Sequence, residues 1–403
     1  MKNRKIVILG NGIAGLSAVK EIRKHQPDTE IVMISDENEI PYLRPLLTKT
    51  YIRTFQRQRI QIEEDSWYQT QGIKLHKGKR VESILTKDQL VLLEGGGKEC
   101  YDACIYALGA HNFIPPFSGA EQAGVHSVRT VADLNRIRSG LAVAEHAVVI
   151  GGGVIGLEMA WEIAQMGCHV TILEAGQRLL ERLLDEQSAG VLSAIITKKG
   201  LNVYTGVQVE ELTGSGDVTG VRLADGRWFS AGLVVVSCGI RANIEVARKA
   251  GLSCERGVIV TDRLETSVPG IFAAGDCIQT QEPNPGLWNY SRKSGEVAGY
   301  NALFPSDPRL FRPDQEPVIL NAMGTSLYSI GTITTDDFRV EIAGSSGREE
   351  KQFLINHHEG TQQAYSKRFY QQGQLCGAVV IGDLSQIRSI KQEIRGGKSD
   401  GTE

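Results

Sequence analysis

The chain has 403 residues, of which 41% are hydrophobic and 23% are charged, and its formal net charge is −3. This length exceeds what one hydrophobic core supports, so we expect two or three domains of a globular protein. The small negative charge argues against nucleic-acid binding, and no apolar run approaches the ~18 residues of a membrane span. The apolar run Ile6 to Leu9 is too short for a signal peptide, which favours a cytoplasmic location.

A glycine-rich loop follows this first apolar run. Lys5 to Leu9 predicts a buried parallel strand, and a helical pattern begins a few residues later. Between them Gly10, Gly12 and Gly15 form the pattern G-x-G-x-x-G. Such glycines allow a tight turn and let the backbone approach a pyrophosphate, which the amino-terminal dipole of the helix also attracts.

An acidic side chain at the end of the next strand is the second part of a dinucleotide site, because it accepts a hydrogen bond from a ribose hydroxyl. Ile31 to Ser35 predicts this strand, which is followed by Asp36 and Glu37. We expect one of these two carboxylates to contact the adenosine ribose.

The first strand–helix–strand unit is too short to close its own sheet. Glu94 to Lys98 predicts a hairpin turn, and Tyr101 to Ala110 predicts a strand that runs into a turn of small residues. Pro115 and Pro116 then break the chain.

A second dinucleotide loop lies about 140 residues after the first. Ala147 to Ile150 predicts its strand, and Gly151, Gly153 and Gly156 repeat the glycine pattern before another helix. Two such loops indicate two dinucleotides.

The strand predicted at Val170 to Leu173 ends at Glu174. A carboxylate there accepts from a 2′-hydroxyl and repels a 2′-phosphate, which favours NADH over NADPH. Arg178, four residues later, is the feature that could reverse this preference.

Two further strands continue the pattern. Leu233 to Gly239 predicts a strand and turn that close the second region, and Gly270 to Asp276 predicts a strand that ends in Gly-Asp. We therefore expect an α/β protein with two Rossmann-like domains, in which the NAD-binding domain is inserted into the FAD-binding domain.

The seven cysteines are scattered and odd in number, which is typical of reduced thiols. The chain has no C-x-x-C pair, and its eight histidines show no metal-ligand spacing. We predict no metal site.

At this point the motifs resemble the flavoprotein reductases with two dinucleotide-binding folds. Ala107-Leu108-Gly109 stands in place of the usual Ala-Thr-Gly turn, and Gly275-Asp276 matches a family motif. Pro41 to Lys49 (P-Y-L-R-P-L-L-T-K) is similar to the segment P-Y-x-R-P-x-L-S-K. That segment occurs in rubredoxin and ferredoxin reductases, in the flavoprotein part of NADH-dependent nitrite reductases and in apoptosis-inducing factor.

The carboxyl-terminal pieces Val318 to Gly324, Leu327 to Gly331 and Leu375 to Asp383 resemble the small last domain of NADH:rubredoxin oxidoreductases, which is α+β. The expected domains are FAD-binding (1–112 and 238–308), NAD-binding (113–237) and carboxyl-terminal (309–395), with a disordered tail (396–403).

The resemblance implies FAD on the first loop and NADH on the second. Asp276 is the expected acceptor for the ribityl chain, and the helix that starts near Trp288 to Ser291 is expected to point its N–H groups at the flavin pyrimidine edge. The expected cofactor contacts are Gly10, Gly12, Ala14, Gly15, Asp36, Glu37, Arg44, Lys49, Val81, Ala107, Gly109, Gly275, Asp276, Gly151, Gly153, Ile155, Gly156, Glu174 and Gly239.

Two residues are implied in catalysis. The resemblance places Glu158 between the nicotinamide and the flavin and pairs it with Lys49, whose ammonium near flavin N5 would stabilise the reduced flavin. The alternative for Glu158 is an exposed helix glutamate favoured by the dipole of the first turn.

The chain has no cysteine before Cys100, so the redox cysteine pair of the disulfide reductases is missing and electrons must leave the flavin directly. We expect an NADH dehydrogenase that passes electrons to a small redox protein, rubredoxin first among them. The alternatives are an NADH oxidase, a nitrite-reductase-type flavoprotein component, or a flavoprotein that signals by NADH-dependent conformation or dimerisation. The protein is expected to be a monomer or homodimer.

Basic residues gather in the stretch Pro41 to Gln61, which holds no acidic residue. This pattern predicts either a solvated helix face or a basic rim that attracts an acidic partner. The residues concerned are Arg44, Lys49, Arg53, Arg57 and Arg59.

Overall fold

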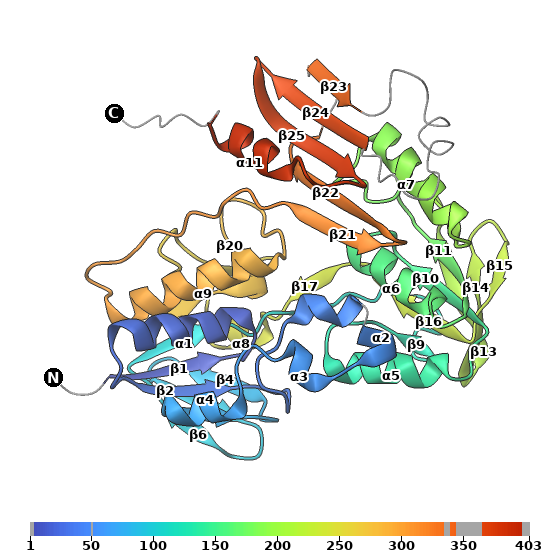
Figure 1. The fold of residues 1–403 in the computed structure, drawn as a ribbon. Coiled ribbons are helices and arrows are strands. Elements are labelled where there is room, and N and C mark those ends of the chain that lie inside the picture. Colours follow the sequence, from blue (N-terminus) through green and yellow to red (C-terminus); the bar gives the residue numbers. More distant parts are fainter. Residues whose placement is uncertain (1–3, 50, 334–338, 344–364, 397–403) are drawn as a thin grey trace. The chain divides into compact units, whose positions relative to one another are not determined.

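The computed structural model describes residues 4–49, 51–333, 339–343 and 365–396, and the chain forms two compact units (Figure 1). Unit 1 comprises Met1–Pro45, Gln56–His111 and Ile240–Asp314. Unit 2 comprises Leu46–Phe55, Asn112–Gly239 and Gln315–Glu403.

A five-stranded parallel sheet forms the centre of unit 1. Its central strand is β1, where Ile8 pairs with Met33 on one side and with Ile105 on the other. These three side chains are fully buried, as expected for parallel strands covered on both faces. The strand order is β19 (Ile271–Ala273), β7 (Ala103–Tyr106), β1 (Lys5–Leu9), β2 (Glu30–Ile34) and β3 (Ile73–His76).

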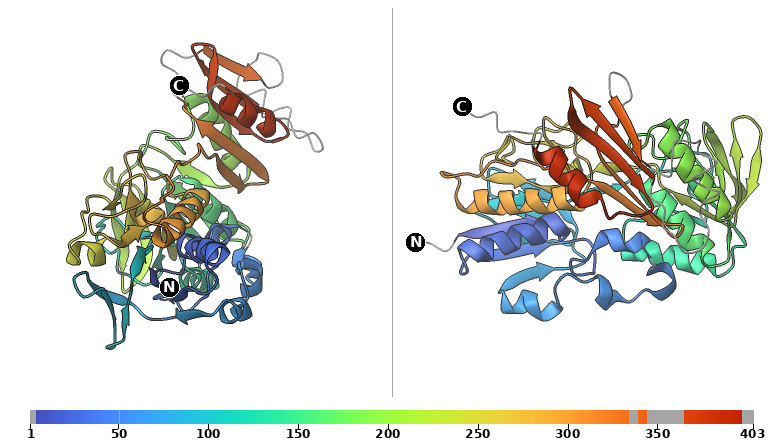
Figure 2. Two further views of the ribbon diagram at one scale, coloured as in Figure 1. Left: turned by 90° about the vertical axis from the view of Figure 1, so that its left-hand side faces the viewer. Right: turned by 45° about the horizontal axis from the view of Figure 1, so that its top comes forward.

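Helices α1 (Ile13–His25) and α9 (Trp288–Leu303) lie side by side in unit 1 (Figures 1 and 2). Their contact requires glycine, because a Cβ at Gly295 would lie 2.1 Å from the Ala14 carbonyl oxygen. Gly299, one turn later, is also close to α1, since its Cβ would lie 2.6 Å from the Ala18 carbonyl oxygen. This packing fixes the first turns of α1, directly after the first glycine-rich loop.

The other elements of unit 1 are short. An antiparallel sheet contains β4 (Val81–Leu85), β5 (Leu90–Leu93) and β6 (Lys98–Cys100). The paired strands are β8 (Ala110–Asn112) with β17 (Ile240–Ala242), and β18 (Val258–Ile259) with β20 (Ile278–Gln279). The helices are α3 (Arg57–Ile60), α4 (Asp65–Thr70), α8 (Glu245–Lys249) and the 3₁₀ turn η2 (Gly275–Cys277). The chain passes to unit 2 within the 3₁₀ turn η1 (Arg44–Thr48).

Unit 2 repeats the arrangement of the first sheet. Its central strand β10 has two parallel strands on each side, as β1 has. The order is β12 (Asn202–Tyr204), β11 (His169–Leu173), β10 (His146–Ile150), β16 (Leu233–Val236) and β9 (Val125–His126). The remaining elements of this part are α2 (Tyr51–Thr54), α5 (Val131–Leu141), α6 (Val154–Ala164), α7 (Glu186–Lys198) and the antiparallel strands β13 (Val209–Ser215), β14 (Asp217–Leu223) and β15 (Trp228–Ser230).

The carboxyl-terminal part of unit 2 is an antiparallel sheet with one helix packed on β25. The order is β21 (Val318–Ala322), β22 (Thr325–Gly331), β25 (Gln374–Ile381), β24 (Tyr365–Gln371) and β23 (Arg339–Ala343), and the helix is α11 (Ile387–Gly396). A buried ion pair between Lys367 and Asp185 joins this sheet to the start of α7, and β21 packs against α6.

These elements confirm the predicted fold class of two Rossmann-like sheets and a small α+β domain. The insertion is visible in the topology, because β19 follows all strands of the second sheet in sequence and yet pairs with β7 of the first. The expected domain boundaries stay predictions. Leu46–Phe55, expected in the FAD-binding domain, belongs to unit 2.

Two runs predicted as a strand that leads into a turn contain short strands. Of the run from Tyr101 to Ala110 only Ala103–Tyr106 forms β7, and of Gly270 to Asp276 only Ile271–Ala273 forms β19. Gly109, Gly270 and Gly275 have positive φ angles, which end the extended conformation in these turns. The predicted tail lies outside the described residues except for Gly396, which ends α11.

Within the described ranges, no helix is both long and apolar enough to cross a membrane.

The contact between α1 and α9 can be tested with Gly295→Ala. Alanine is favoured over glycine inside a helix by roughly 1 kcal/mol, but the added methyl group would collide with α1. We expect the free energy of unfolding in urea to fall by about 1–3 kcal/mol, the cost of overpacking. Glu296→Ala, at a neighbouring side chain that is 39% exposed, should change it by less than about 0.5 kcal/mol. An equally stable or more stable Gly295→Ala would contradict the contact.

Candidate functional site

The first glycine-rich loop packs against the turn that follows β7. Gly10 has φ +108°, and a Cβ there would lie 2.1 Å from the Ala107 carbonyl oxygen. A Cβ at Gly15 would lie 2.1 Å from the Gly10 carbonyl oxygen, where α1 crosses the loop. The first and third glycines are therefore required by the fold itself.

The second loop repeats this geometry within unit 2. Gly151 has φ +111°, and its Cβ would lie 2.3 Å from the Ser237 carbonyl oxygen in the turn after β16. A Cβ at Gly156 would lie 2.0 Å from the Gly151 carbonyl oxygen. Glycine is again required at both positions.

The middle glycines differ from the outer ones. Gly12 (φ −71°, ψ −173°) and Gly153 (φ −77°, ψ 177°) have backbone angles open to any residue, and no atom lies within 4 Å of a Cβ at either position. Each is the N-cap residue of the following helix and has no side chain to bind the first helix N–H groups, and the first turn of that helix has no acidic residue. Each loop thus offers open space and helix N–H groups to an anion, which fits a dinucleotide pyrophosphate.

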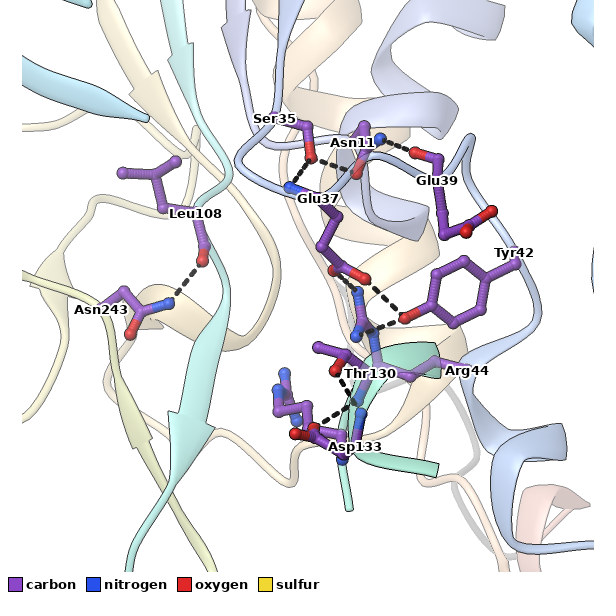
Figure 3. Close-up of polar contacts among 11 residues, drawn as sticks. Asn11, Ser35, Glu37, Glu39, Tyr42, Arg44, Leu108, Thr130, Asp133 and Asn243 are labelled. Carbon is purple, nitrogen blue, oxygen red and sulfur yellow. Dashed lines mark hydrogen bonds and ion pairs between the residues drawn. The ribbon is translucent and has the colours of Figure 1, made fainter. Parts of the chain in front are cut away.

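The acidic residues after β2 have separate surroundings in unit 1. Glu37 is half-buried, and its two carboxylate oxygens accept hydrogen bonds from Arg44 and from the Tyr42 hydroxyl, both at 2.7 Å (Figure 3). Asp36 is exposed. The guanidinium of Arg44 also lies over the Tyr42 ring, 4.9 Å from its centroid. The nine-residue segment therefore holds Arg44 in a fixed position beside the first loop.

Asn11 braces this region and was not singled out by the sequence analysis. Its side-chain amide donates to the Glu39 carbonyl oxygen at 2.7 Å and accepts from the Ser35 hydroxyl at 2.8 Å (Figure 3). Ser35 Oγ in turn accepts the Glu37 backbone N–H at 3.1 Å. The sequence signal that could have identified Asn11 is its polar side chain at the variable second position of the glycine pattern.

The turn after β19 reaches the same edge of the first sheet. A Cβ at Gly275 would lie 2.9 Å from the Ala14 Cβ, so this turn touches the start of α1. Asp276 accepts a hydrogen bond from the Ser291 hydroxyl at 2.9 Å, in the first turn of α9. The helix begins at Trp288, within the predicted range.

The other expected contacts lie in the same turns, with one exception. Ala107 and Gly109 form the turn after β7, which the Asn243 side chain holds by donating to the Leu108 carbonyl oxygen at 2.8 Å (Figure 3). Gly239 has φ +95° in the corresponding turn of unit 2, and the side chain of Ile155 is 43% exposed at the start of α6. Val81 is the exception, because it begins β4 and is buried in the core of unit 1.

Glu174 follows β11 and lies against the second loop. Its carboxylate accepts the backbone N–H groups of Gly152 at 2.5 Å and Gly176 at 2.6 Å. Arg178 is turned to other partners, since its guanidinium donates to the carbonyl oxygens of Leu184 at 3.0 Å and Glu181 at 3.3 Å.

Glu158 is only 3% exposed, so the alternative prediction of an exposed helix glutamate is wrong. One of its carboxylate oxygens accepts from the Lys49 ammonium, and the other accepts from the Thr48 hydroxyl. The backbone N–H of Asn321 also acts on this carboxyl group and lowers its pKa. All four residues belong to unit 2, so the predicted Lys49–Glu158 pair exists within one compact unit.

Burial raises the pKa of the Glu158 carboxyl above its ordinary value, although Lys49, Thr48 and Asn321 act in the opposite direction. Lys49 remains partly accessible, with its side chain 27% exposed. The result is a dry carboxylate paired with an ammonium that solvent or a ligand can reach.

Thr48 and Asn321 were not predicted as site residues. Thr48 stands where the similar reductases have serine in the segment that ends at Lys49. Both residues carry a hydroxyl group, and this shared group was a signal that could have identified Thr48. Asn321 contributes a backbone group, for which a side-chain pattern gives no signal.

Cys277, beside Asp276, is fully buried in unit 1. Burial raises the pKa of its thiol to about 12, and the thiol donates to the Ala274 carbonyl oxygen. It stays protonated and is not a nucleophile at neutral pH.

The basic stretch is only partly paired with acidic groups. In unit 1, Arg57 forms an ion pair with Glu39 at 2.6 Å, and Arg59 is exposed. In unit 2, Arg53 is exposed on α2.

Two family models match the chain. Residues 4–295 match the model described as pyridine nucleotide-disulphide oxidoreductase, and residues 317–398 match the rubredoxin NAD+ reductase C-terminal domain.

Individual relatives cover the chain to different extents. It is 35% identical over 271 residues to the biphenyl dioxygenase system ferredoxin–NAD(+) reductase component of Paraburkholderia xenovorans (strain LB400), covering 67% of this chain and 66% of that protein. It is 28% identical to nitrite reductase [NAD(P)H] of Bacillus subtilis (strain 168), covering 96% of this chain. The chain spans only 46% of that nitrite reductase.

The chain is also similar to the crystal structure of NADH:rubredoxin oxidoreductase from Clostridium acetobutylicum, with a TM-score of 0.77 and 27% sequence identity. The match covers 100% of this chain and 97% of the oxidoreductase chain. The family model extends over well over half of the sequence and includes both glycine-rich loops. The chain therefore belongs to the pyridine nucleotide-disulphide oxidoreductase family, with a carboxyl-terminal domain of the rubredoxin NAD+ reductase type.

Proposed function

We propose that this protein is an FAD-dependent NADH oxidoreductase that passes electrons to a small redox protein, with rubredoxin as the first candidate. The observation that carries the proposal is the pair of loops whose middle glycines, Gly12 and Gly153, face open space. Two dinucleotide sites and no cysteine before Cys100 fit a flavoprotein that gives electrons directly to its acceptor.

FAD fits the first loop. The pyrophosphate would meet Gly12 and the first turn of α1, with Arg44 close to the loop. Asp36 is the proposed acceptor for the adenosine ribose, because it is exposed, whereas the Glu37 carboxylate is neutralised by its ion pair with Arg44. Asp276 would accept from the ribityl chain. When bound, the flavin supplies an acceptor for hydride and a donor for single electrons.

The second loop fits NADH. Glu174 would accept from the adenosine 2′-hydroxyl, and its negative charge would repel a 2′-phosphate. Arg178, the cation that could favour NADPH, is directed to the carbonyl oxygens of Leu184 and Glu181 instead. Ile155, at the start of α6, and Gly239, in the turn after β16, would also lie beside the nucleotide.

Lys49 and Glu158 are the proposed catalytic residues. The Lys49 ammonium would stabilise the negative charge that develops on hydride transfer, and the buried Glu158 carboxylate holds that ammonium in place. Because Glu158 is largely withdrawn from water, its charge acts on Lys49 with little screening.

The acceptor is proposed from similarity and charge. The full-length match to NADH:rubredoxin oxidoreductase and the matching carboxyl-terminal domain support rubredoxin. The exposed Arg53 and Arg59 would steer an acidic partner and raise its encounter rate. The similarity to nitrite reductase supports one second candidate, a flavoprotein component of such a system. A cytoplasmic location and a monomeric or homodimeric state remain predictions.

The two middle glycines give a matched pair of variants. A side chain at either position fits the fold but fills the space proposed for a pyrophosphate. Gly12→Val should lose bound FAD, measured by absorbance of the purified protein, while wild type holds about one FAD. Gly153→Val should keep its FAD and weaken NADH binding more than tenfold. Equal FAD content in wild type and Gly12→Val would contradict the assignment of the first loop.

Nucleotide choice can be tested at Glu174. Wild type should prefer NADH, and Glu174→Ala should narrow the preference over NADPH by roughly 1–3 kcal/mol, since a charge-assisted hydrogen bond and a repulsion are lost. The measurement is kcat/KM for both nucleotides. Arg178→Ala serves as the control and should leave the preference unchanged. A wild-type preference for NADPH would refute the role of Glu174.

The proposed reaction is tested by stopped-flow reduction with NADH, followed by mixing with rubredoxin, ferredoxin or oxygenated buffer. Lys49→Met should slow flavin reduction more than tenfold while FAD stays bound. Arg53→Glu with Arg59→Glu should slow only the transfer to the acceptor protein, and salt above ~0.1 M should do the same, because it screens the steering charges. Reoxidation that is fast with oxygen alone would instead identify an oxidase.

A further inference from the structure

The two carboxylate oxygens of Glu158 accept hydrogen bonds from two different side chains. Thr48 and Lys49 are adjacent in sequence at the end of η1, and each donates to a different oxygen of the carboxylate. Thr48 is 6% exposed, so its hydroxyl bonds Glu158 in a place that water hardly reaches. A buried carboxylate requires such donors, because an uncompensated buried charge is costly.

The third donor comes from the carboxyl-terminal sheet. β21 is an edge strand of this sheet. It pairs with β22 and also packs against α6. The side chain of Asn321 is engaged elsewhere, because its Oδ1 accepts from the Ser326 hydroxyl at 2.7 Å. An edge strand has N–H groups that no neighbouring strand uses. The backbone N–H of Asn321 acts on the Glu158 carboxyl from this strand and lowers its pKa.

We propose that Thr48 and the backbone N–H of Asn321 are positioning groups that hold the Glu158 carboxylate ionised and directed at Lys49. A strand of the carboxyl-terminal domain thereby becomes part of the catalytic pair's support. This inference rests on the proposed function for the role of the pair, whereas the state of the carboxylate can be measured without it.

The other charged groups around α6 do not replace these donors. Glu162, another buried carboxyl residue, lies one turn further along the helix and cannot act as a donor to an ionised Glu158 in its own carboxylate form. β16 and β21 contain no titratable residue, and β10 and β11 carry histidines only at their first positions, at the opposite end from the start of α6. The titratable residues of the packed elements are Lys49, Tyr51, Arg53, His146, Glu162 and His169.

The sign of the pH effect follows from the charge on each form. Burial raises the pKa of Glu158, and donors to the ionised form lower it. Removing one donor therefore raises this pKa further, so Glu158 becomes protonated and releases Lys49 at a higher pH. Flavin reduction by NADH should then lose rate on the acid side at a higher pH than in wild type.

Matched variants separate the donors from other effects. Thr48→Val keeps the shape and removes the hydroxyl, and Thr48→Ser restores it. Asn321→Pro removes the N–H at an edge-strand position that tolerates proline, whereas Asn321→Ala removes only the side chain. Thr48→Val and Asn321→Pro should each move the acid midpoint of flavin reduction to higher pH by about one unit, the effect of losing a hydrogen bond to a charged group. Thr48→Ser and Asn321→Ala should match wild type.

A second measurement does not depend on activity. In protein labelled with ¹³C at the glutamate carboxyl, the Glu158 signal is identified by its loss in Glu158→Gln, and its titration should shift in the same direction in the same two variants. Unshifted titrations in Thr48→Val and Asn321→Pro would overturn the inference. If the titrations shift but Glu158→Gln reduces its flavin at the wild-type rate, the proposed role of the pair in catalysis fails while the positioning stands.

Discussion

The close approach of each glycine-rich loop to the turn after a neighbouring strand sets the geometry of both dinucleotide sites. Gly10 touches the Ala107 carbonyl oxygen and Gly151 touches that of Ser237, at separations no side chain permits. This contact brings the loop, the helix start and the adjacent turn to one edge of the sheet. A Cβ at the remaining glycine, Gly12 or Gly153, would meet no atom within 4 Å, so the same constraint that builds the turn leaves a space for phosphate.

The two sites differ in what closes them. At the second loop the Glu174 carboxylate binds N–H groups of the loop directly. At the first loop the corresponding position after the strand is Ser35, which meets the Asn11 side chain, and the carboxylate of Glu37 lies two residues later. The same strand–loop–helix arrangement thus places its acidic residue differently in the two units, as expected if the two loops bind different nucleotides.

Most of the fold follows from local patterns in the sequence. The apolar runs at Lys5–Leu9 and His146–Ile150, the glycine spacings and the return of the chain at Ile271–Ala273 predict both sheets and the insertion. Strand ends were less predictable, because they depend on where individual glycines adopt positive φ angles.

Part of the candidate site could be predicted from motifs in the sequence. Lys49, Glu158 and Glu174 lie in motifs with fixed spacing, and the structure brings the first two together within unit 2. Asn11, Thr48 and Asn321 were missed, since they act on other residues of the site through hydrogen bonds formed only after folding. The contact expected at Val81 stays a prediction, and the side chain of this residue is packed in the core of unit 1.

The proposed use of an edge-strand N–H by Glu158 has a consequence for the sequence of this domain. A backbone donor is supplied by nineteen of the twenty amino acids, so the residue at position 321 can drift without loss of the contact while the strand's register cannot. A one-residue insertion or deletion in β21 would turn a different peptide toward α6 and leave the carboxylate without this partner. The proposed contact therefore constrains the register of β21 rather than the side chain at position 321.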